Sequence, residues 1–162
     1  MLELPPIIDE YEHKVADFLT KIGFSFVASR SQFNKSEAEM AREIDLLFTY
    51  QNCLFIIEVS TVKSGRNFKI LAFMYRWSKQ KNFERLKQKH PDVPNNVMRI
   101  FFDLSKDTPE NKSQDVEELT EDLGNMVIYK DVFEKLNSTE NVEQVITDFL
   151  GNDWFVKTEK FP

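Results

Sequence analysis

The chain has 162 residues, of which 41% are hydrophobic and 15 are phenylalanine, and it carries a formal net charge of −6 at pH 7. This composition predicts one domain with a substantial core and excludes an intrinsically disordered chain. No apolar run approaches the roughly 20 residues of a membrane-spanning helix, and the N-terminal residues lack the pattern of a signal peptide, so we expect a cytoplasmic protein with no membrane partner.

Cysteine, histidine and glycine usage excludes several classes of site. The single cysteine, Cys53, cannot form an internal disulfide, and no cluster of cysteine and histidine residues offers a zinc site. The chain has four glycines and no glycine-rich phosphate loop, which excludes a P-loop NTPase or a dinucleotide-binding fold.

Hydrophobic periodicity and turn residues predict alternating helices and strands along the chain. In chain order, the expected elements are a helix over 7–22, a strand over 24–33, strands over 44–50 and 53–59 joined by a turn at Gln51-Asn52, one basic helix between Asn67 and Pro91, a strand over 97–104, a helix over 115–123, a strand over 126–129, and helices over 131–136 and 142–150. This order predicts a mixed α/β domain over residues 1–150. Residues 151–162 either pack back on the domain as a tail or begin a linker.

Two acidic residues lie within the predicted hairpin, one on each apolar strand. Asp45 precedes Leu-Leu-Phe, and Glu58 follows Leu-Phe-Ile-Ile. Burying an ionised carboxylate costs several kcal/mol unless a cation or a hydrogen-bond donor compensates. A shared divalent metal is one such compensation, and an ion pair with Lys or Arg at the strand edge is the alternative.

The segment from Asp45 to Glu58-Val59-Ser60 resembles the core of the PD-(D/E)XK nuclease superfamily, which has the restriction endonuclease-like fold. That family places an Asp near the start of one strand and Glu-x-Lys near the end of the next. The resemblance implies an αβββαβ core with a mixed central sheet flanked by helices. It also implies Mg²⁺-dependent or Mn²⁺-dependent hydrolysis of phosphodiester bonds, with DNA expected over RNA, and Asp45, Glu58 and the carbonyl of Val59 as metal ligands.

Position 60 departs from this pattern, because Ser stands where the family has Lys. Ser60 either donates a hydrogen bond to a water or phosphate oxygen or simply ends the strand. Lys63, or a lysine of the following helix such as Lys69 or Lys79, could replace the missing catalytic cation. The resemblance also suggests a further metal ligand from the first helix, for which Glu12 is the candidate, and the alternative for Glu12 is an exposed helix acid.

Positive charge is concentrated directly after the hairpin. The segment 63–89 contains nine basic residues against Glu84 alone, a net charge of +8 that leaves −14 for the rest of the chain. We expect this segment to contact nucleic-acid phosphates, although a solvated helix surface is the alternative. The residues expected to make these contacts are Lys63, Arg66, Lys69, Arg76, Lys79 and Lys81. Tyr75 and Trp77, in the same segment, either stack on bases or belong to the core.

Two functions are consistent with these patterns. The first is a metal-dependent endonuclease acting on DNA, which the two retained acids favour. The second is a catalytically inactive nuclease-like domain that binds nucleic acid or protein within a larger protein, which the absence of the usual lysine favours. A homodimer and a fused or separate motor or helicase partner are both compatible with the resemblance.

Overall fold

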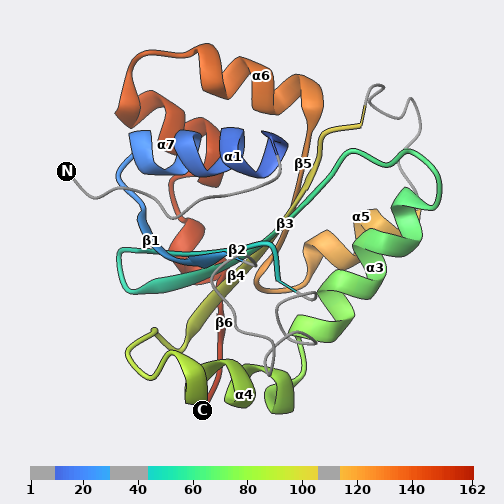
Figure 1. The fold of residues 1–162 in the computed structure, drawn as a ribbon, viewed down its shortest axis with the longest axis vertical. Coiled ribbons are helices and arrows are strands. Elements are labelled where there is room, and N and C mark those ends of the chain that lie inside the picture. The colour runs from blue at the N-terminus through green and yellow to red at the C-terminus, as the bar shows by residue number, and fades with distance from the viewer. Residues whose placement is uncertain (1–9, 30–43, 106–113) are drawn as a thin grey trace.

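The computed structural model of the chain describes residues 10–29, 44–105 and 114–162 (Figure 1). Its helices are α1 (Glu10–Lys21), α3 (Arg66–Trp77), α4 (Gln80–Lys89), α5 (Gln114–Glu121), α6 (Lys130–Ser138), α7 (Val142–Leu150) and the short 3₁₀ helix η3 (Trp154–Lys157). Its strands are β1 (Ser25–Ser29), β2 (Leu46–Tyr50), β3 (Cys53–Ser60), β4 (Asn96–Asp103), β5 (Asn125–Tyr129) and β6 (Glu159–Lys160). The predicted α/β class is confirmed. Residues 7–9 of the predicted first helix and residues 30–33 of the predicted first strand lie outside the described residues.

The strands form one mixed sheet in the order β1-β2-β3-β4-β5. The first three strands are antiparallel, β3, β4 and β5 are parallel, and β6 adds to β4 in the antiparallel sense. Helices α3 and α4 connect β3 to β4, and α5 connects β4 to β5. Because these crossover helices cover the parallel strands, β4 is buried along nearly its whole length.

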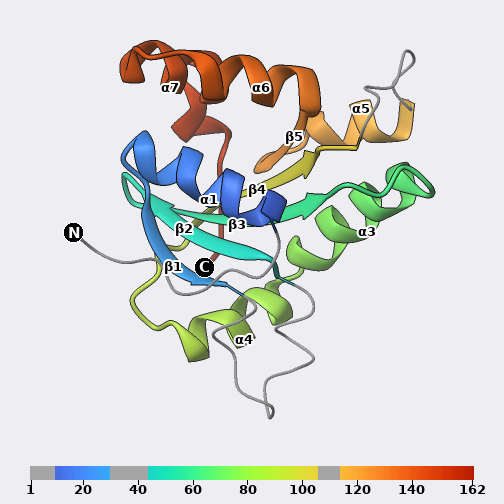
Figure 2. The same cartoon turned by 45° about the horizontal axis from the view of Figure 1, so that its top comes forward.

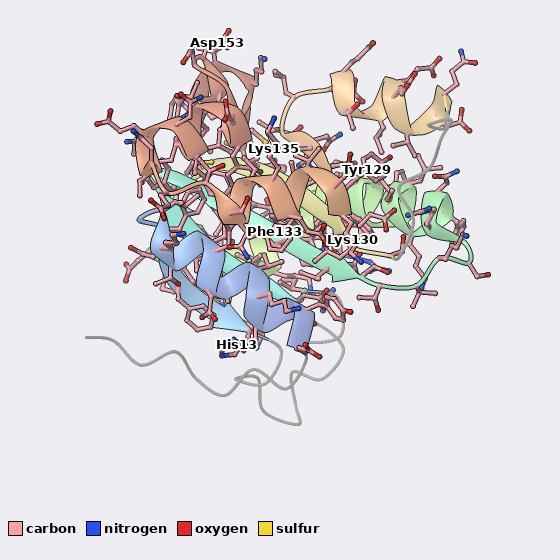
Figure 3. All side chains as sticks on the ribbon, turned by 90° about the horizontal axis from the view of Figure 1, so that it is seen from above. His13, Tyr129, Lys130, Phe133, Lys135 and Asp153 are labelled. Carbon is pink, nitrogen blue, oxygen red and sulfur yellow. The ribbon has the colours of Figure 1, made fainter. Side chains whose placement is uncertain are left out.

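Helices cover both faces of the sheet. In Figures 1 and 2, α1, α6 and α7 lie on one face, and α3, α4 and α5 lie on the other. Figure 3 shows the first layer from above, where Phe133 of α6 packs edge-on against Phe18 of α1 at 5.4 Å between ring centroids. The second layer packs Phe73 and Trp77 of α3 against its own face of the sheet. Within the described residues, no helix is both long and apolar enough to cross a membrane.

A two-residue turn fixes the register of the β2–β3 hairpin. Gln51 and Asn52 have φ angles of 44° and 60°, which suit the tight turns that follow the twist of paired strands. Tyr50 and Cys53 therefore form the pair next to the turn. Cys53 is fully buried, and its burial raises the pKa of the thiol to about 12.

The single basic helix predicted between Asn67 and Pro91 is wrong, because two helices occupy this segment. After α3 ends, Lys79 adopts an extended conformation with a ψ of 127° before α4 begins. The Ser78 hydroxyl donates to the Tyr75 carbonyl at 2.9 Å, and Asn82 Nδ2 donates to the Arg76 carbonyl at 2.7 Å. These side chains satisfy carbonyls at the end of α3, and the break lets Phe83 of α4 reach the core.

Residues 151–162 pack on the domain. Trp154 in η3 and Phe161 are buried, and the Phe161 ring stacks on Phe83 at 4.5 Å between centroids. Arg99 of β4, which is only 1% exposed, forms an ion pair with Glu159 of β6 at 2.5 Å. The guanidinium of Arg99 also donates to Asn125 Oδ1, the Trp77 carbonyl and the Leu123 carbonyl. The C-terminal residues are thus held by strand pairing, aromatic packing and an ion pair to the buried Arg99.

Gly124 lies against this buried arginine. Its φ of +80° belongs to the left-handed region, and an added Cβ would lie 3.0 Å from both Arg99 Nη2 and the Val97 carbonyl oxygen. Its amide donates to the Lys157 carbonyl at 2.6 Å, and its carbonyl accepts from the Arg99 amide at 2.6 Å. Glycine is therefore required here by both backbone conformation and space.

Candidate active site

Asp45 and Glu58 are the first residues beyond the last ladder pair of the hairpin. The antiparallel ladder ends at the pair of Leu46 with Ile57, so Asp45 directly precedes β2 and lies outside the strand predicted over 44–50, whereas Glu58 lies on β3. Leu47 and Ile56, two positions from each acid, pack in the core beneath α3, so both carboxylates face α3.

Asp45 is held in place by the backbone of the neighbouring strand. Its side chain is buried, with the residue 5% exposed, and its Oδ2 accepts a hydrogen bond from the Val59 amide at 2.8 Å. A hydrogen bond from N–H to an ionised carboxylate is among the stronger ones in proteins. Glu58, on the neighbouring strand β3, is half-buried. The pair therefore combines one fixed carboxylate with one that is more accessible to solvent.

Both acids line a pocket of about 410 Å³ between the carboxyl end of β3 and the helix α3. Its wall on the sheet is formed by Asp45, Phe101 and the residues Glu58 to Val62, and its wall on α3 is formed by Phe68, Lys69, Ala72, Phe73 and Arg76. Two basic residues thus lie across the pocket from two acidic ones. Such a combination can bind a cation and an anionic group side by side.

The spacing along α3 explains why these residues line the pocket. Ile70, Phe73, Met74 and Trp77 are buried on the side of α3 that faces the core. Lys69, Ala72 and Arg76 follow the i, i+3, i+7 spacing and so share an adjacent flank of the helix. Ala72 has the smallest side chain of this flank, which leaves space between Lys69 and Arg76.

Val59 and Ser60 also line the pocket. The side chain of Val59 packs against the core on the opposite face of the sheet, so its backbone borders the pocket. The Ser60 hydroxyl accepts a hydrogen bond from the Val62 amide at 3.3 Å, which stabilises the turn at the end of β3.

The lysines proposed to replace the missing motif lysine occupy different places. Lys69 lines the pocket, whereas Lys63 is exposed and is not among the described residues that line it. Lys79 lies at the start of α4, where its Nζ is 4.3 Å from the centroid of the Tyr75 ring. Lys81 is exposed in the first turn of α4. Lys69 is therefore the lysine that the fold brings to the acids.

Glu12 belongs to the opposite helical layer. It is buried, with 5% of the residue exposed, on α1, which packs on the face of the sheet away from α3. The alternative of an exposed helix acid is therefore wrong. Among residues 10–29, 44–105 and 114–162, no group of three or more His, Cys, Asp or Glu side chains is arranged to hold a metal ion. Glu12 thus does not form a three-acid cluster with Asp45 and Glu58.

Arg66 has a structural partner at the neighbouring strand end. Its Nε is 2.7 Å from Asp103 Oδ2, its Nη2 donates to the Ser105 hydroxyl, and the two charged side chains are 12% and 0% exposed. The Ser105 hydroxyl and amide also donate to Asp103 Oδ1. Arg66 thus anchors the first residue of α3 to the end of β4. Arg66 was predicted to bind phosphate, and Asp103 was not among the predicted site residues. Its sequence signal is its place at the end of the apolar run of β4, similar to that of Asp45 at the start of an apolar run.

Tyr129 extends this polar cluster to the carboxyl end of β5. Asp103 pairs with Ser60 on one side and with Tyr129 on the other in the parallel ladders. Burial raises the pKa of the Tyr129 phenol, the negative charge of Asp103 raises it further, and Arg66 opposes the shift. The ends of β3, β4 and β5 therefore form one continuous polar edge beside the pocket.

The two aromatic residues predicted in the basic segment have opposite environments. Trp77 is fully buried in the core beneath α3, whereas Tyr75 is exposed. Phe68, which the sequence analysis did not single out, is also exposed and borders the pocket. The pocket thus combines two carboxylates, two cations and an aromatic rim.

Comparisons of the chain with protein-family models, with curated proteins and with solved structures give no match.

Proposed function

We propose that the chain is a metal-dependent nuclease that hydrolyses phosphodiester bonds of DNA. The observation that carries the proposal is that Asp45 and Glu58, at the open end of the hairpin, line one pocket together with Lys69 and Arg76. The element order supports a restriction endonuclease-like fold, because a helix precedes three antiparallel strands and a helical crossover leads to a parallel fourth strand.

The donor set fits Mg²⁺ or Mn²⁺. These cations prefer oxygen ligands, and Mg²⁺ retains several waters, so it needs only one or two protein carboxylates together with substrate phosphate oxygens. Asp45, Glu58 and the backbone carbonyl of Val59 would hold the ion. A bound ion would supply Lewis acidity at the phosphate and a water of lowered pKa.

The residues of the chain would divide the remaining work between them. Asp45 keeps its orientation through the Val59 amide, so the more accessible Glu58 is the carboxylate able to adjust to the substrate. Lys69 and Arg76, on the facing helix, would attract the scissile phosphate and stabilise negative charge as it develops. Lys69 would take the role that the family assigns to the lysine missing at position 60.

Ser60 favours a second function, a nuclease-like domain without catalysis that binds nucleic acid through its basic helices. This domain would keep the fold and the cations of α3 while lacking a group to orient the attacking water. The two functions differ in whether the pocket turns over substrate, and binding of metal by the acids is compatible with both.

The test compares cleavage of single-stranded DNA, duplex DNA and RNA in Mg²⁺ or Mn²⁺ by the native chain and by Asp45→Asn, Glu58→Gln and Lys69→Met. Each change should lower the rate roughly a hundredfold or more, because it removes several kcal/mol of transition-state stabilisation. Lys63→Met and Lys135→Met are the matched controls. Lys135 is exposed on α6 in the opposite layer, and both controls should retain activity (Figure 3).

Metal binding provides a readout that does not depend on turnover. At about 100 times its dissociation constant, Mn²⁺ should stabilise the native chain by about 2.7 kcal/mol, and Asp45→Asn should abolish this gain. A gain without cleavage would support the binding domain. The absence of both a gain and cleavage would overturn the nuclease proposal.

A further inference from the structure

Two large aromatic side chains project into solvent from α3. Phe68 is 75% exposed and Tyr75 is 66% exposed, although the core-facing side of the same helix is fully packed. Exposed apolar groups gathered on one surface often mark a binding site. Phe68 also forms part of the wall of the pocket that contains Asp45 and Glu58.

The two rings lie on one line along the helix. They are seven residues apart, which is two helical turns and about 10.5 Å along the axis. Ala72 lies between them on the pocket side, and its small side chain leaves the space between the rings open. The spacing gives two separate flat surfaces, with room for a nucleotide between them.

Positive charge accompanies both rings. Lys69 and Arg76 each follow one ring in sequence and line the pocket, and the Lys79 ammonium lies 4.3 Å from the centroid of the Tyr75 ring. The helix α3 contains no acidic residue. Protein-binding surfaces are depleted of charge at their centre, whereas aromatic rings alternating with cations are typical of surfaces that bind unpaired bases.

We propose that Phe68 and Tyr75 form a stacking platform for the unpaired bases of single-stranded DNA, and that Lys69, Arg76 and Lys79 hold the phosphates of the same strand. The platform leads the strand into the pocket at Phe68. This inference rests on the proposed function for the identity of the nucleic acid. Duplex DNA does not fit the platform, because its base faces are already stacked on one another.

The test measures binding of a fluorescent single-stranded oligonucleotide by anisotropy in EDTA, so that no cleavage occurs. Phe68→Ala and Tyr75→Ala should each weaken binding roughly fivefold to a hundredfold, the effect of removing one stacked base. Phe155→Ala is the matched control, because Phe155 is another exposed phenylalanine, 41% accessible, on η3. Circular dichroism and thermal unfolding verify that each variant keeps its fold.

A second arm changes the nucleic acid instead of the protein. An abasic strand keeps its phosphates but has no rings, so the native chain should bind it as weakly as the double variant Phe68→Ala/Tyr75→Ala binds normal DNA. The double variant should lose no further affinity for the abasic strand. If the double variant lost as much affinity for the abasic strand as for normal DNA, the rings would not contact bases.

Three results would overturn the platform. The first is unchanged affinity in both ring variants, and the second is tighter, ring-dependent binding of RNA. The third is ring-dependent self-association of the chain in sedimentation without any effect on DNA binding, which would assign the rings to a second copy. Cleavage of duplex DNA with no ring dependence would remove this inference and leave the nuclease proposal intact. Binding of single-stranded DNA that depends on the rings, without cleavage, would support this inference and remove the nuclease proposal.

Discussion

Replacing Arg66 by methionine should destabilise the fold. It should not change the salt dependence of nucleic-acid binding, which the removal of a phosphate-binding cation would change. The change removes the guanidinium that lies 2.7 Å from an Asp103 carboxylate with 0% exposure. Breaking a buried ion pair from one side typically costs about 3–5 kcal/mol, because the other charge stays buried. For a chain of this length, that corresponds to a fall of roughly 6–20 °C in Tm. Arg66→Met/Asp103→Asn should recover most of the loss, since it removes both charges.

Urea unfolding and the salt dependence of oligonucleotide binding separate these roles. Lys69→Met should change the free energy of unfolding by no more than about 0.5 kcal/mol, because Lys69 lies at the pocket surface. It should also flatten the plot of log affinity against log salt by about 0.7 for each phosphate that the variant no longer neutralises. Arg66→Met should leave this slope unchanged. The assignment of Arg66 as an anchor of α3 is refuted if its variant stays within about 1 kcal/mol of the native chain and flattens the slope as Lys69→Met does.

Three further predictions concern the fold. Phe161→Ala should lower the free energy of unfolding in urea by about 3–5 kcal/mol, because it removes a buried ring stacked on Phe83; a loss under about 1 kcal/mol would mean that the C-terminal residues are not docked. The folded-state pKa of Cys53 is about 12 against an ordinary 9.0, so the unfolded thiol releases its proton first as pH rises. Between pH 8 and pH 10, the free energy of unfolding should therefore fall by about 1.4 kcal/mol more for the native chain than for Cys53→Ala. If plots of this free energy against pH were parallel for the two chains, the raised pKa would be contradicted. Replacing Gln51 by Asn and Asn52 by Gly should raise stability by about 0.5–1 kcal/mol in urea, because both positions have positive φ, and a loss would show that the side chains matter more than the turn.

The placement of the two acids could be predicted because it depends on local sequence. A two-residue turn at Gln51-Asn52 between two apolar runs fixes which residues pair, and it brings Asp45 and Glu58 to the open end of the same hairpin without any knowledge of the rest of the fold. The strand over 97–104 and the helix over 142–150 were also predicted closely, since a continuous apolar run and a terminal glycine mark them.

The positions of cations and aromatic rings could not be predicted in the same way, because they depend on where helices end and how they rotate. The break between α3 and α4 is stabilised by side-chain contacts to backbone carbonyls, which apolar spacing does not reveal. Rotation of α3 about its axis buries Trp77, exposes Tyr75 and directs Lys69 to the pocket. Lys63 is closer to Glu58 in sequence, but sequence distance does not measure distance across a loop.

The packing around Gly124 affects how a mutational scan of this protein would look. Any side chain at this position would adopt a strained backbone and press on Arg99, whose guanidinium joins β4 to the end of α3 and to β6. Substitutions at Gly124 and Arg99 should therefore be depleted in a selection for the proposed nuclease activity as strongly as those at Asp45. A parallel measurement of protein abundance would separate them, because variants of the glycine and the arginine would disappear from the cell while variants of the carboxylate would accumulate as folded protein.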